Sequence, residues 1–373
     1  MNLPVWDLPR PFSLPPLDGE VEADVCVVGL GGSGLAAVHR ALDLGATVVG
    51  VDAGVVAGGA AGRNGGFLLA GVADFHHDAV ATLGRERAVA LYRLTLEQLD
   101  RIAAETPAAV RRVGSLRVAA SAEEERDCAA QLEAMRADGL PVEPYDGSEG
   151  RGLLVPTDAA FQPQRRCVAL AERALARGAR LFERTAALDL GDGIVVADPG
   201  LVRCRAALVL VDGRLERLLP ELAPRVRTAR LQMLATAPVP PRFRRPVYAR
   251  YGYDYWQQLE DGRVVLGGCR DLFEAEEWTT DATPTAPVQA ALDRLLGERL
   301  GVAAPVTHRW AASVAYTEDG LPICEAVRPG VWAAGAYSGT GNVVGALCGR
   351  ALAELALAGR TALDALVSRP SGS

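Results

Sequence analysis

The protein has 373 residues, of which 49% are hydrophobic and 23% charged, so it is long enough for two domains with buried cores and is not disordered as a whole. Its formal net charge of −7 argues against nucleic acid or an anionic membrane as a partner. All 39 basic residues are arginines, which excludes mechanisms that need a lysine, such as a Schiff base or a P-loop.

The segment from Met1 to Pro16 has no basic stretch followed by an apolar run, so it does not resemble a secretory signal. Charged residues interrupt the apolar segments elsewhere, and none offers the roughly 20 uninterrupted residues that a membrane span needs. The seven cysteines are odd in number and include no C-x-x-C pair, which favours free thiols in a reducing compartment. We therefore expect a cytoplasmic protein without a membrane span.

The first elements form a β-turn-α-β pattern. Ala23 to Val28 is a short apolar run typical of a buried parallel strand, and it leads directly into Gly-Leu-Gly-Gly-Ser-Gly at 29–34. A helix is predicted from Leu35 to Leu44, and a second strand from Thr47 to Val51 is followed by Asp52. Together these features match the G-x-G-x-x-G fingerprint of dinucleotide binding.

Each position of this fingerprint has a mechanical role. Gly29 permits a tight turn, Gly31 lets the backbone approach a pyrophosphate, and Gly34 lets the helix pack close to the strand. The helix N-terminus offers N–H groups and a positive dipole to the pyrophosphate. Asp52 can accept hydrogen bonds from an adenosine ribose and would repel a 2′-phosphate, which disfavours NADP. This unit alone serves FAD and NAD equally well.

Two further glycine clusters lie outside the fingerprint. The stretch from Gly58 to Phe67 is too rich in glycine for a stable strand or helix, which favours a loop whose backbone passes close to a flat or anionic group. The stretch from Gly335 to Asn342 follows a predicted strand at Val331–Ala334 and precedes a predicted helix at Val343–Leu357. A second helix N-terminus can stabilise negative charge, so we expect one long ligand held at both ends.

The middle of the chain predicts a second domain. Its predicted elements are helices at Leu83–Arg112, Ser121–Asp138 and Leu170–Arg177, a strand at Ala179–Thr185, and a hairpin of Tyr248–Leu259 and Arg263–Gly268 around an Asp-Gly turn. An antiparallel sheet inserted into a doubly wound domain accounts for this order. No histidine spacing suits a metal, so no metal site is expected.

The chain resembles the D-amino-acid-oxidase/glycine-oxidase family of FAD-dependent enzymes that oxidise C–N bonds. Four stretches carry the resemblance over nearly the whole length: Gly29 to Gly34, Gly62-Arg63-Asn64-Gly65-Gly66, Asp319-Gly320-Leu321-Pro322, and Tyr337-Ser338-Gly339-x-Gly341. The branch typified by gamma-glutamylputrescine oxidoreductase is the most similar. Its members share the Trp6 region and a tyrosine-rich strand like Tyr251-Gly-Tyr253-Asp-Tyr255-Trp256.

The resemblance implies which residues contact FAD. The expected cofactor-binding residues are Gly29, Gly31, Gly32, Ser33, Gly34, Asp52, Ala53, Gly62, Arg63, Asn64, Gly65, Gly66, Ala187, Gly339, Thr340, Gly341 and Asn342. Among them, Ala187 would meet the adenine through its backbone, and Gly339 to Asn342 would face the pyrimidine edge of the flavin. The candidates for a substrate pocket are Phe67, Tyr253, Tyr255 and Trp256, although these aromatic residues fit sheet packing equally well.

The sequence departs from the family at two positions near the Thr317-x-Asp-Gly stretch. Amino-acid oxidases of the family usually carry an arginine where this chain has Val314, so a clamp for a substrate carboxylate is not expected and amines are favoured. Covalently flavinylated members carry a cysteine where this chain has Ala312, so we expect non-covalent FAD. Some secondary-amine oxidases of the family use a lysine to promote the reaction of the flavin with oxygen, and this chain has no lysine. Whether oxygen or another compound accepts the electrons is therefore left open.

We therefore expect an α/β fold with a Rossmann-type FAD-binding domain and an inserted α+β substrate domain. The expected FAD-binding domain comprises residues 1–85, 150–220 and 319–373, and the substrate domain comprises 86–149 and 221–318. The expected reaction is oxidation of a CH–NH bond in an amine or amino acid to an imine, by hydride transfer to flavin N5 and then hydrolysis. An NAD-dependent dehydrogenase and a non-catalytic flavin-binding protein are the alternatives. Neither the oligomeric state nor the exact amine follows from the sequence.

Overall fold

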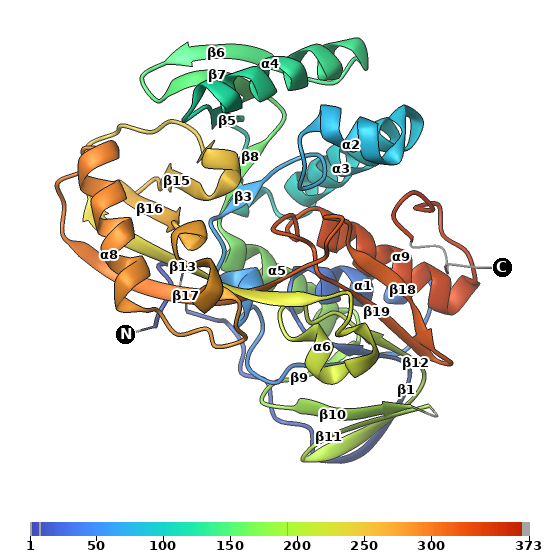
Figure 1. Ribbon diagram of the computed structural model, residues 1–373. Helices are drawn as coiled ribbons and strands as arrows, with labels where there is room; N and C mark the ends of the chain where they lie inside the picture. Colours follow the sequence, from blue (N-terminus) through green and yellow to red (C-terminus); the bar gives the residue numbers. More distant parts are fainter. Residues whose placement is uncertain (1, 7–8, 192, 368–373) are drawn as a thin grey trace. The chain divides into compact units, whose positions relative to one another are not determined.

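The chain divides into two compact units (Figure 1). The computed structural model describes residues 2–6, 9–191 and 193–367. We call the described parts of 8–62, 163–228 and 314–373 the parallel-sheet unit, and those of 1–7, 63–162 and 229–313 the antiparallel-sheet unit. One passage of the chain from the parallel-sheet unit to the antiparallel-sheet unit lies between residues 62 and 63. The expected roles of the two domains stay predictions, and part of the C-terminal piece, 368–373, lies outside the described residues.

The parallel-sheet unit is built on five parallel strands in the order β19–β12–β1–β2–β9. Strand β18 pairs antiparallel with β19, and the hairpin of β10 and β11 pairs antiparallel with β12. The strands are β1 (Gly19–Val28), β2 (Val48–Val51), β9 (Arg180–Phe182), β10 (Ala186–Gly191), β11 (Ile194–Asp198), β12 (Gly200–Val209), β18 (Ile323–Arg328) and β19 (Val331–Gly335). Parallel strands end at the same edge of a sheet, so the segments that follow β1, β2, β12 and β19 share one edge.

The main helices of this unit pack on one another. Helix α1 contacts both α9 and α5, and α9 also contacts β19 (Figure 1). The helices are α1 (Gly32–Asp43), α5 (Pro163–Ala176), the short α6 (Leu215–Leu218) and α9 (Val344–Ala358). The last four residues of β1 are all buried, as expected for a strand that is covered on both faces.

The antiparallel-sheet unit contains an eight-stranded sheet in the order β17–β13–β16–β15–β14–β5–β7–β6. Most of its strand pairs are antiparallel, but β14 and β5 are parallel. Its strands are β5 (Ser115–Val118), β6 (Glu143–Gly147), β7 (Gly150–Val155), β13 (Arg227–Pro238), β14 (Val247–Ala249), β15 (Asp254–Gln258), β16 (Arg263–Gly268) and β17 (Val306–Tyr316). A small second sheet is formed by β3 (Phe67–Leu68), β8 (Ala159–Phe161) and β4 (Val110–Arg111).

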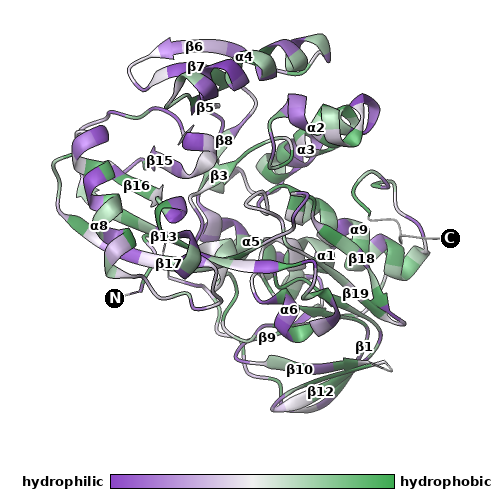
Figure 2. Ribbon diagram, viewed as in Figure 1, coloured by the Kyte–Doolittle hydropathy of each residue, from purple (hydrophilic) through white to green (hydrophobic). Residues whose placement is uncertain are grey.

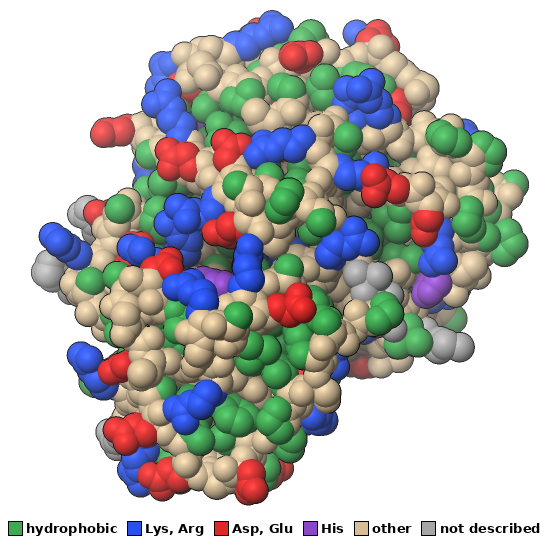
Figure 3. All heavy atoms as spheres, turned by 180° about the vertical axis from the view of Figure 1, so that it is seen from behind, with side chains coloured by type: hydrophobic (Ala, Val, Ile, Leu, Met, Phe, Trp, Pro, Cys, Tyr) green, Lys and Arg blue, Asp and Glu red, His purple; other side chains and the backbone are tan. Residues whose placement is uncertain are grey.

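The helices of this unit are α2 (His76–Leu83), α3 (Arg85–Glu105), α4 (Ala122–Ala137), α7 (Glu274–Glu277) and α8 (Ala286–Arg294). Hydrophobic and hydrophilic residues alternate along α8, as Figure 2 shows, which is typical of a helix with one face on a core. On the face of the molecule seen in Figure 3, arginine side chains lie among carboxylates rather than in one basic patch. Within the described residues, no helix combines the length and the hydropathy of a bilayer-crossing segment.

The structure confirms the predicted α/β class, with a parallel sheet and a separate, largely antiparallel sheet. Three predicted elements were wrong in extent. The helix expected to run to Arg112 ends at Glu105, because Pro107 cannot continue it. Helix α5 begins at Pro163 rather than at Leu170, since proline suits the first turn of a helix. The strand expected at Tyr248–Leu259 is interrupted by a turn at Arg250–Gly252.

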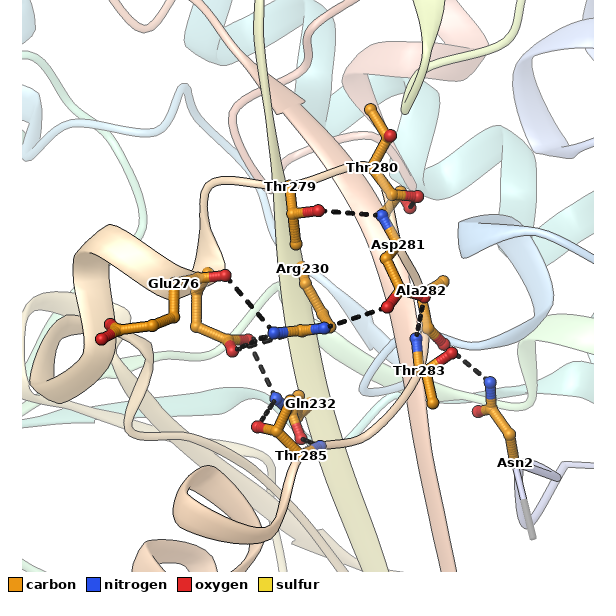
Figure 4. A network of polar contacts seen from close by, with 12 residues as sticks. Asn2, Arg230, Gln232, Glu276, Thr279, Thr280, Asp281, Ala282, Thr283 and Thr285 are labelled. Atoms are coloured by element: carbon orange, nitrogen blue, oxygen red, sulfur yellow. Dashed lines mark hydrogen bonds and ion pairs between the residues drawn. The ribbon is translucent and has the colours of Figure 1, made fainter.

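A buried ion pair joins the last residue of α7 to strand β13 (Figure 4). Arg230 Nη2 donates to Glu277 Oε1 at 2.7 Å, and the two residues are 5% and 1% exposed. Gln232 Nε2 donates to the other carboxylate oxygen at 2.9 Å and to Thr285 Oγ1 at 2.8 Å. Arg230 Nη1 also lies 3.5 Å from a carboxylate oxygen of Asp281. The segment 276–285 is thus held in place by its contacts with the buried guanidinium of Arg230.

We expect Glu277→Gln to lower the free energy of unfolding by about 2 kcal/mol, because it removes the charge of the buried partner while retaining part of the hydrogen bonding. The measurement is the midpoint of urea unfolding. Glu276→Gln is the matched control, since the side chain of Glu276 is exposed and only its backbone carbonyl accepts from Arg230. Equal midpoints for the two variants would contradict the assigned role of the pair.

Candidate functional site

The turn between β1 and α1 is closed by glycines that leave no room for side chains. Gly29 has φ +101°, and a Cβ on it would lie 2.6 Å from the carbonyl oxygen of Leu210. A Cβ on Gly34 would lie 1.8 Å from the carbonyl oxygen of Gly29, so α1 begins as close to the end of β1 as backbone allows. Gly31 is the N-cap residue of α1 and provides no side-chain cap, and the first turn contains no acidic residue. The backbone N–H groups at the start of α1 are therefore accessible to an anion bound at this turn.

Asp52 lies at the same edge of the sheet, directly after β2. Its Oδ2 accepts from the N–H of Leu30 at 2.8 Å, and its Oδ1 accepts from the N–H of Gly54 at 2.8 Å. Burial raises the pKa of this carboxyl above its ordinary value, and the two N–H donors partly offset the effect. The neighbouring Ala53 is exposed. The structure thus holds the acid of the fingerprint against the glycine turn.

The loop between β19 and α9 is fixed by a half-buried carboxylate that sequence reasoning missed. Asp212, just after β12, accepts from the N–H of Tyr337 at 3.1 Å and from the N–H of Ala315 at 3.3 Å. Burial raises the pKa of Asp212 to about 6, against the opposing effect of these N–H donors. In the same loop Gly339 has φ +89°, and a Cβ on it would meet no atom within 4 Å. Its backbone therefore faces open space.

The two glycine loops of this unit come together at the starts of α1 and α9. A Cβ on Gly349 would lie 2.1 Å from the carbonyl oxygen of Ser33, so the two helices cross with backbones in close contact. A Cβ on Gly345 would lie 3.1 Å from the ring of Tyr337 and 3.5 Å from Cβ of Ser33. Neither helix has a side-chain cap or an acidic residue in its first turn. The edge can therefore hold one extended, negatively charged ligand such as FAD.

Three other expected residues of this unit lie in three different places. Gly62 belongs to the loop after β2, where a Cβ would lie 2.1 Å from the carbonyl oxygen of Ala57 and 2.9 Å from Cγ of Gln164. Ala187 is not in a strand that ends at Thr185. It lies in β10 and pairs with Ala197 of β11. Thr340 Oγ1 donates to the carbonyl oxygen of Tyr337 at 2.7 Å and closes the turn that precedes α9.

In the antiparallel-sheet unit, side chains hold the backbone of 63–66 by its carbonyl groups. Trp310 Nε1 donates to the carbonyl oxygen of Arg63 at 2.8 Å, and Trp6 Nε1 donates to that of Asn64 at 2.7 Å. Gln257 Nε2 donates to the carbonyl oxygens of Gly65 at 2.5 Å and Gly66 at 2.9 Å. The side chain of Asn64 accepts from the N–H of Gly66 at 2.9 Å. The loop is therefore rigidly held on this sheet.

The aromatic candidates are separated by the two faces of the sheet. Phe67, Tyr248 and Tyr255, which we call the ring cluster, lie together with ring centroids 5.1 to 6.0 Å apart. Trp256 is 2% exposed and packs against Phe243 in the core on the opposite face, since successive residues of a strand alternate. Tyr253 is 37% exposed and stands apart from the cluster.

A glycine makes room for the ring of Tyr255. Gly267 faces Tyr255 across β15 and β16, and a Cβ on it would lie 2.4 Å from two ring carbons. A Cβ on Gly65 would lie 3.2 Å from the same ring. Tyr255 therefore lies flat between two residues without side chains. The position of Gly267 opposite Tyr255 follows from the register of β15 and β16, which the sequence did not predict.

No metal centre is evident in the part of the chain that the structure describes, where no group of three His, Cys, Asp or Glu side chains is placed to bind one. His76 Nε2 lies 2.7 Å from a carboxylate oxygen of Asp138, so this histidine has a hydrogen-bond partner within the fold. All seven cysteines are buried and unbridged.

Known proteins are similar to this chain over most of its length. A family model described as "DAO: FAD dependent oxidoreductase" matches residues 24–355. A probable oxidoreductase OrdL of Rhizobium meliloti is 30% identical, over 96% of this chain and 89% of that protein. The gamma-glutamylputrescine oxidoreductase of Escherichia coli is 25% identical, over 95% of this chain and 88% of that protein.

Solved structures show the same fold at lower identity. L-proline dehydrogenase from P. horikoshii superposes with a TM-score of 0.77 at 18% identity, covering 94% of this chain and 96% of that one. Glycine oxidase from Geobacillus kaustophilus superposes with a TM-score of 0.74 at 20% identity, covering 94% and 100%. At these identities the likeness supports the fold.

Proposed function

The chain belongs to the DAO family of FAD-dependent oxidoreductases, and from this premise we propose that it oxidises the CH–NH bond of an amine to an imine, which then hydrolyses. The observation that carries the choice of an amine is the ring cluster of Phe67, Tyr248 and Tyr255. The presence of Val314 at the position where amino-acid oxidases usually have an arginine supports it. The name of the E. coli relative, a gamma-glutamylputrescine oxidoreductase, points to the same class of substrate.

We propose that FAD is held without a covalent bond and that the residues of the parallel-sheet unit expected from the sequence contact it. The glycine turn before α1 would bind the diphosphate, Asp52 the ribose, and the loop from Gly339 to Asn342 the pyrimidine edge of the flavin. The uncapped starts of α1 and α9 support this assignment, because each offers N–H groups to negative charge. The presence of Ala312 in place of a cysteine supports non-covalent binding.

When bound, FAD supplies the two-electron acceptor for a hydride from the carbon next to the amine nitrogen. The protein's part is to bring the amine into the neutral form. An amine with a pKa near 10.4 loses its proton at pH 7 at a cost of roughly 4–5 kcal/mol. Contact with the ring cluster attracts the cation through the ring faces and then lowers its pKa by removing water. The proton passes to solvent, so no protein base is required for the deprotonation.

The test is an anaerobic titration of the purified full-length protein with amines and with the matching amino acids. We expect amines to bleach the flavin absorption and amino acids to bleach it much more slowly. We also expect kcat/KM to rise with pH toward the pKa of the amine. A rate that is flat between pH 6 and 10, or bleaching by amino acids alone, would overturn the choice of an amine.

We expect Gly267→Ala to lower kcat/KM for the amine about 10-fold or more, because the new methyl group displaces the ring of Tyr255 from the cluster. FAD affinity is expected to stay within about 2-fold of the wild type, since Gly267 lies outside the parallel-sheet unit, whose residues are assigned to the cofactor. Steady-state kinetics and a fluorescence titration with FAD measure the two quantities.

Gly297→Ala is the matched control in the same unit, because a Cβ there meets no atom within 4 Å. We expect it to leave both quantities unchanged. If Gly267→Ala also leaves kcat/KM unchanged, the ring cluster does not contact the substrate.

A further inference from the structure

The segment 2–6 of the antiparallel-sheet unit is held at both ends by side-chain hydrogen bonds. At one end, Asn2 Oδ1 accepts from the N–H of Ala311 at 3.1 Å, and Asn2 Nδ2 donates to the carbonyl oxygen of Ala282 at 2.6 Å (Figure 4). At the other end, Trp6 is 2% exposed, and Gln162 Nε2 donates to its carbonyl oxygen at 2.9 Å. The segment forms neither a helix nor a strand, so these contacts determine its position.

Both ends of this segment also contact the loop that leads into β3. Arg63 Nη2 donates to the carbonyl oxygen of Asn2 at 2.9 Å, and Arg63 Nε donates to that of Ala311 at 2.8 Å. Trp6 Nε1 donates to the carbonyl oxygen of Asn64 at 2.7 Å. The segment is therefore bonded to two successive residues of the loop, three positions before Phe67 at the nearest.

The loop held in this way borders the ring cluster. A Cβ on Gly65 would lie 3.2 Å from the ring of Tyr255, and a Cβ on Gly66 would lie 3.0 Å from Cη2 of Trp6. Trp6 also belongs to the same buried hydrophobic core as Phe67 and Tyr255. Because protein interiors are close-packed, a displacement of the Trp6 indole is transmitted to these neighbouring rings.

We propose that Trp6 is a positioning residue of the substrate site, which fixes the loop beside Phe67 and thereby holds the ring cluster against the amine. The proposal rests on the proposed function, because it assumes that the ring cluster contacts the substrate. Trp6 acts through the loop and the shared core and does not itself touch the amine. If the indole is displaced, the rings separate from the amine and water reaches it. The pKa of the bound amine then returns toward its value of about 10.4 in water.

The experiment compares the full-length, flavin-loaded wild type with Trp6→Phe, which keeps a ring in the core but removes the N–H that donates to Asn64. The probe is the amine that reduces the wild-type flavin fastest in the anaerobic titration. We expect kcat/KM for this amine to fall about 10-fold. We also expect the pKa in the pH profile of kcat, which reports the bound amine, to rise by about half a pH unit or more. A tryptophan with only a structural role would lower the midpoint of urea unfolding without moving this pKa.

Asn2→Ala is a second variant at the other end of the segment. Asn2 is exposed, so its replacement leaves no cavity in the core. The variant loses the side-chain bonds to Ala311 and Ala282, and we expect kcat/KM to fall about 3-fold and the same pKa to rise.

Trp278→Phe is the matched control, because Trp278 lies in the same unit and its Nε1 donates to Glu274 Oε1 at 3.3 Å. We expect its kcat/KM to stay within about 2-fold of the wild type and the pKa in its kcat profile to stay unchanged. If that pKa does not rise in Trp6→Phe, or rises equally in Trp278→Phe, the assigned role of Trp6 is wrong. A wild-type flavin that no amine reduces would instead overturn the proposed function.

Discussion

Replacement of Gly34 by alanine is expected to weaken FAD binding at least 100-fold, about 2.7 kcal/mol. The reason is steric, because a Cβ at this position would lie 1.8 Å from the carbonyl oxygen of Gly29. Backbone cannot yield as a flexible side chain does, so α1 must move away from the end of β1. The N–H groups at the start of α1 would then no longer point toward the proposed diphosphate site. Ser33 would also lose its close contact with Gly349.

The measurement is the ratio of flavin to protein absorbance after gel filtration, together with a fluorescence titration of the apoprotein with FAD. Gly297→Ala is again the control, because a Cβ there meets no atom within 4 Å, the glycine does not have a positive φ, and it lies outside the parallel-sheet unit. We expect this variant to retain its flavin. Retention of flavin by Gly34→Ala would show that the turn between β1 and α1 is not the diphosphate site.

Replacement of Asp158 by asparagine is expected to remove a large pH dependence of stability. Asp158 is 3% exposed, and it accepts from Ser115 Oγ at 2.6 Å and from the N–H of Ala70 at 3.0 Å. Burial raises the pKa of this carboxyl from 3.8 to about 7, although both donors oppose the shift. In the folded protein Asp158 therefore holds its proton more tightly than in the unfolded chain.

The sign of the effect follows from this difference. The stabilisation is complete below pH 4 and is lost as the pH rises through about 7, a change of about 4 kcal/mol. Asparagine is neutral throughout, so we expect Asp158→Asn to unfold at higher urea concentration than the wild type at pH 8. At pH 4 we expect the difference to vanish or reverse.

Urea unfolding at both pH values provides the measurement. Asp146→Asn is the control, because the side chain of Asp146 is 80% exposed and its replacement should leave the pH profile unchanged. If Asp158→Asn and the wild type keep the same pH dependence, the carboxyl is ionised in the folded protein throughout this range.

The elements that were correctly predicted from the sequence are those fixed by neighbouring residues. The structure contains the predicted strand, glycine turn, helix and acid between Ala23 and Asp52. Their formation depends on the spacing of hydrophobic residues and glycines over a few positions, which can be recognised in the sequence. Ser121 also caps α4 as predicted, accepting from the N–H of Glu124 at 3.1 Å. Two helix ends were predicted less well because a proline sets them: α3 ends before Pro107, and α5 begins at Pro163.

The sequence by itself determined the family, the glycine turns and the acid of the fingerprint, since each is a local pattern of residue types. The tertiary structure alone decided which side chains from distant parts of the chain come into contact with one another and with these glycine turns. Tertiary packing brings Tyr248 of β14 to Phe67 of β3, and the pairing of β15 with β16 sets Gly267 opposite Tyr255. The packing of α5 on α1 places the charge of Arg166 at Gly32. Such pairings depend on contacts between segments far apart in the chain, and no short-range pattern encodes them.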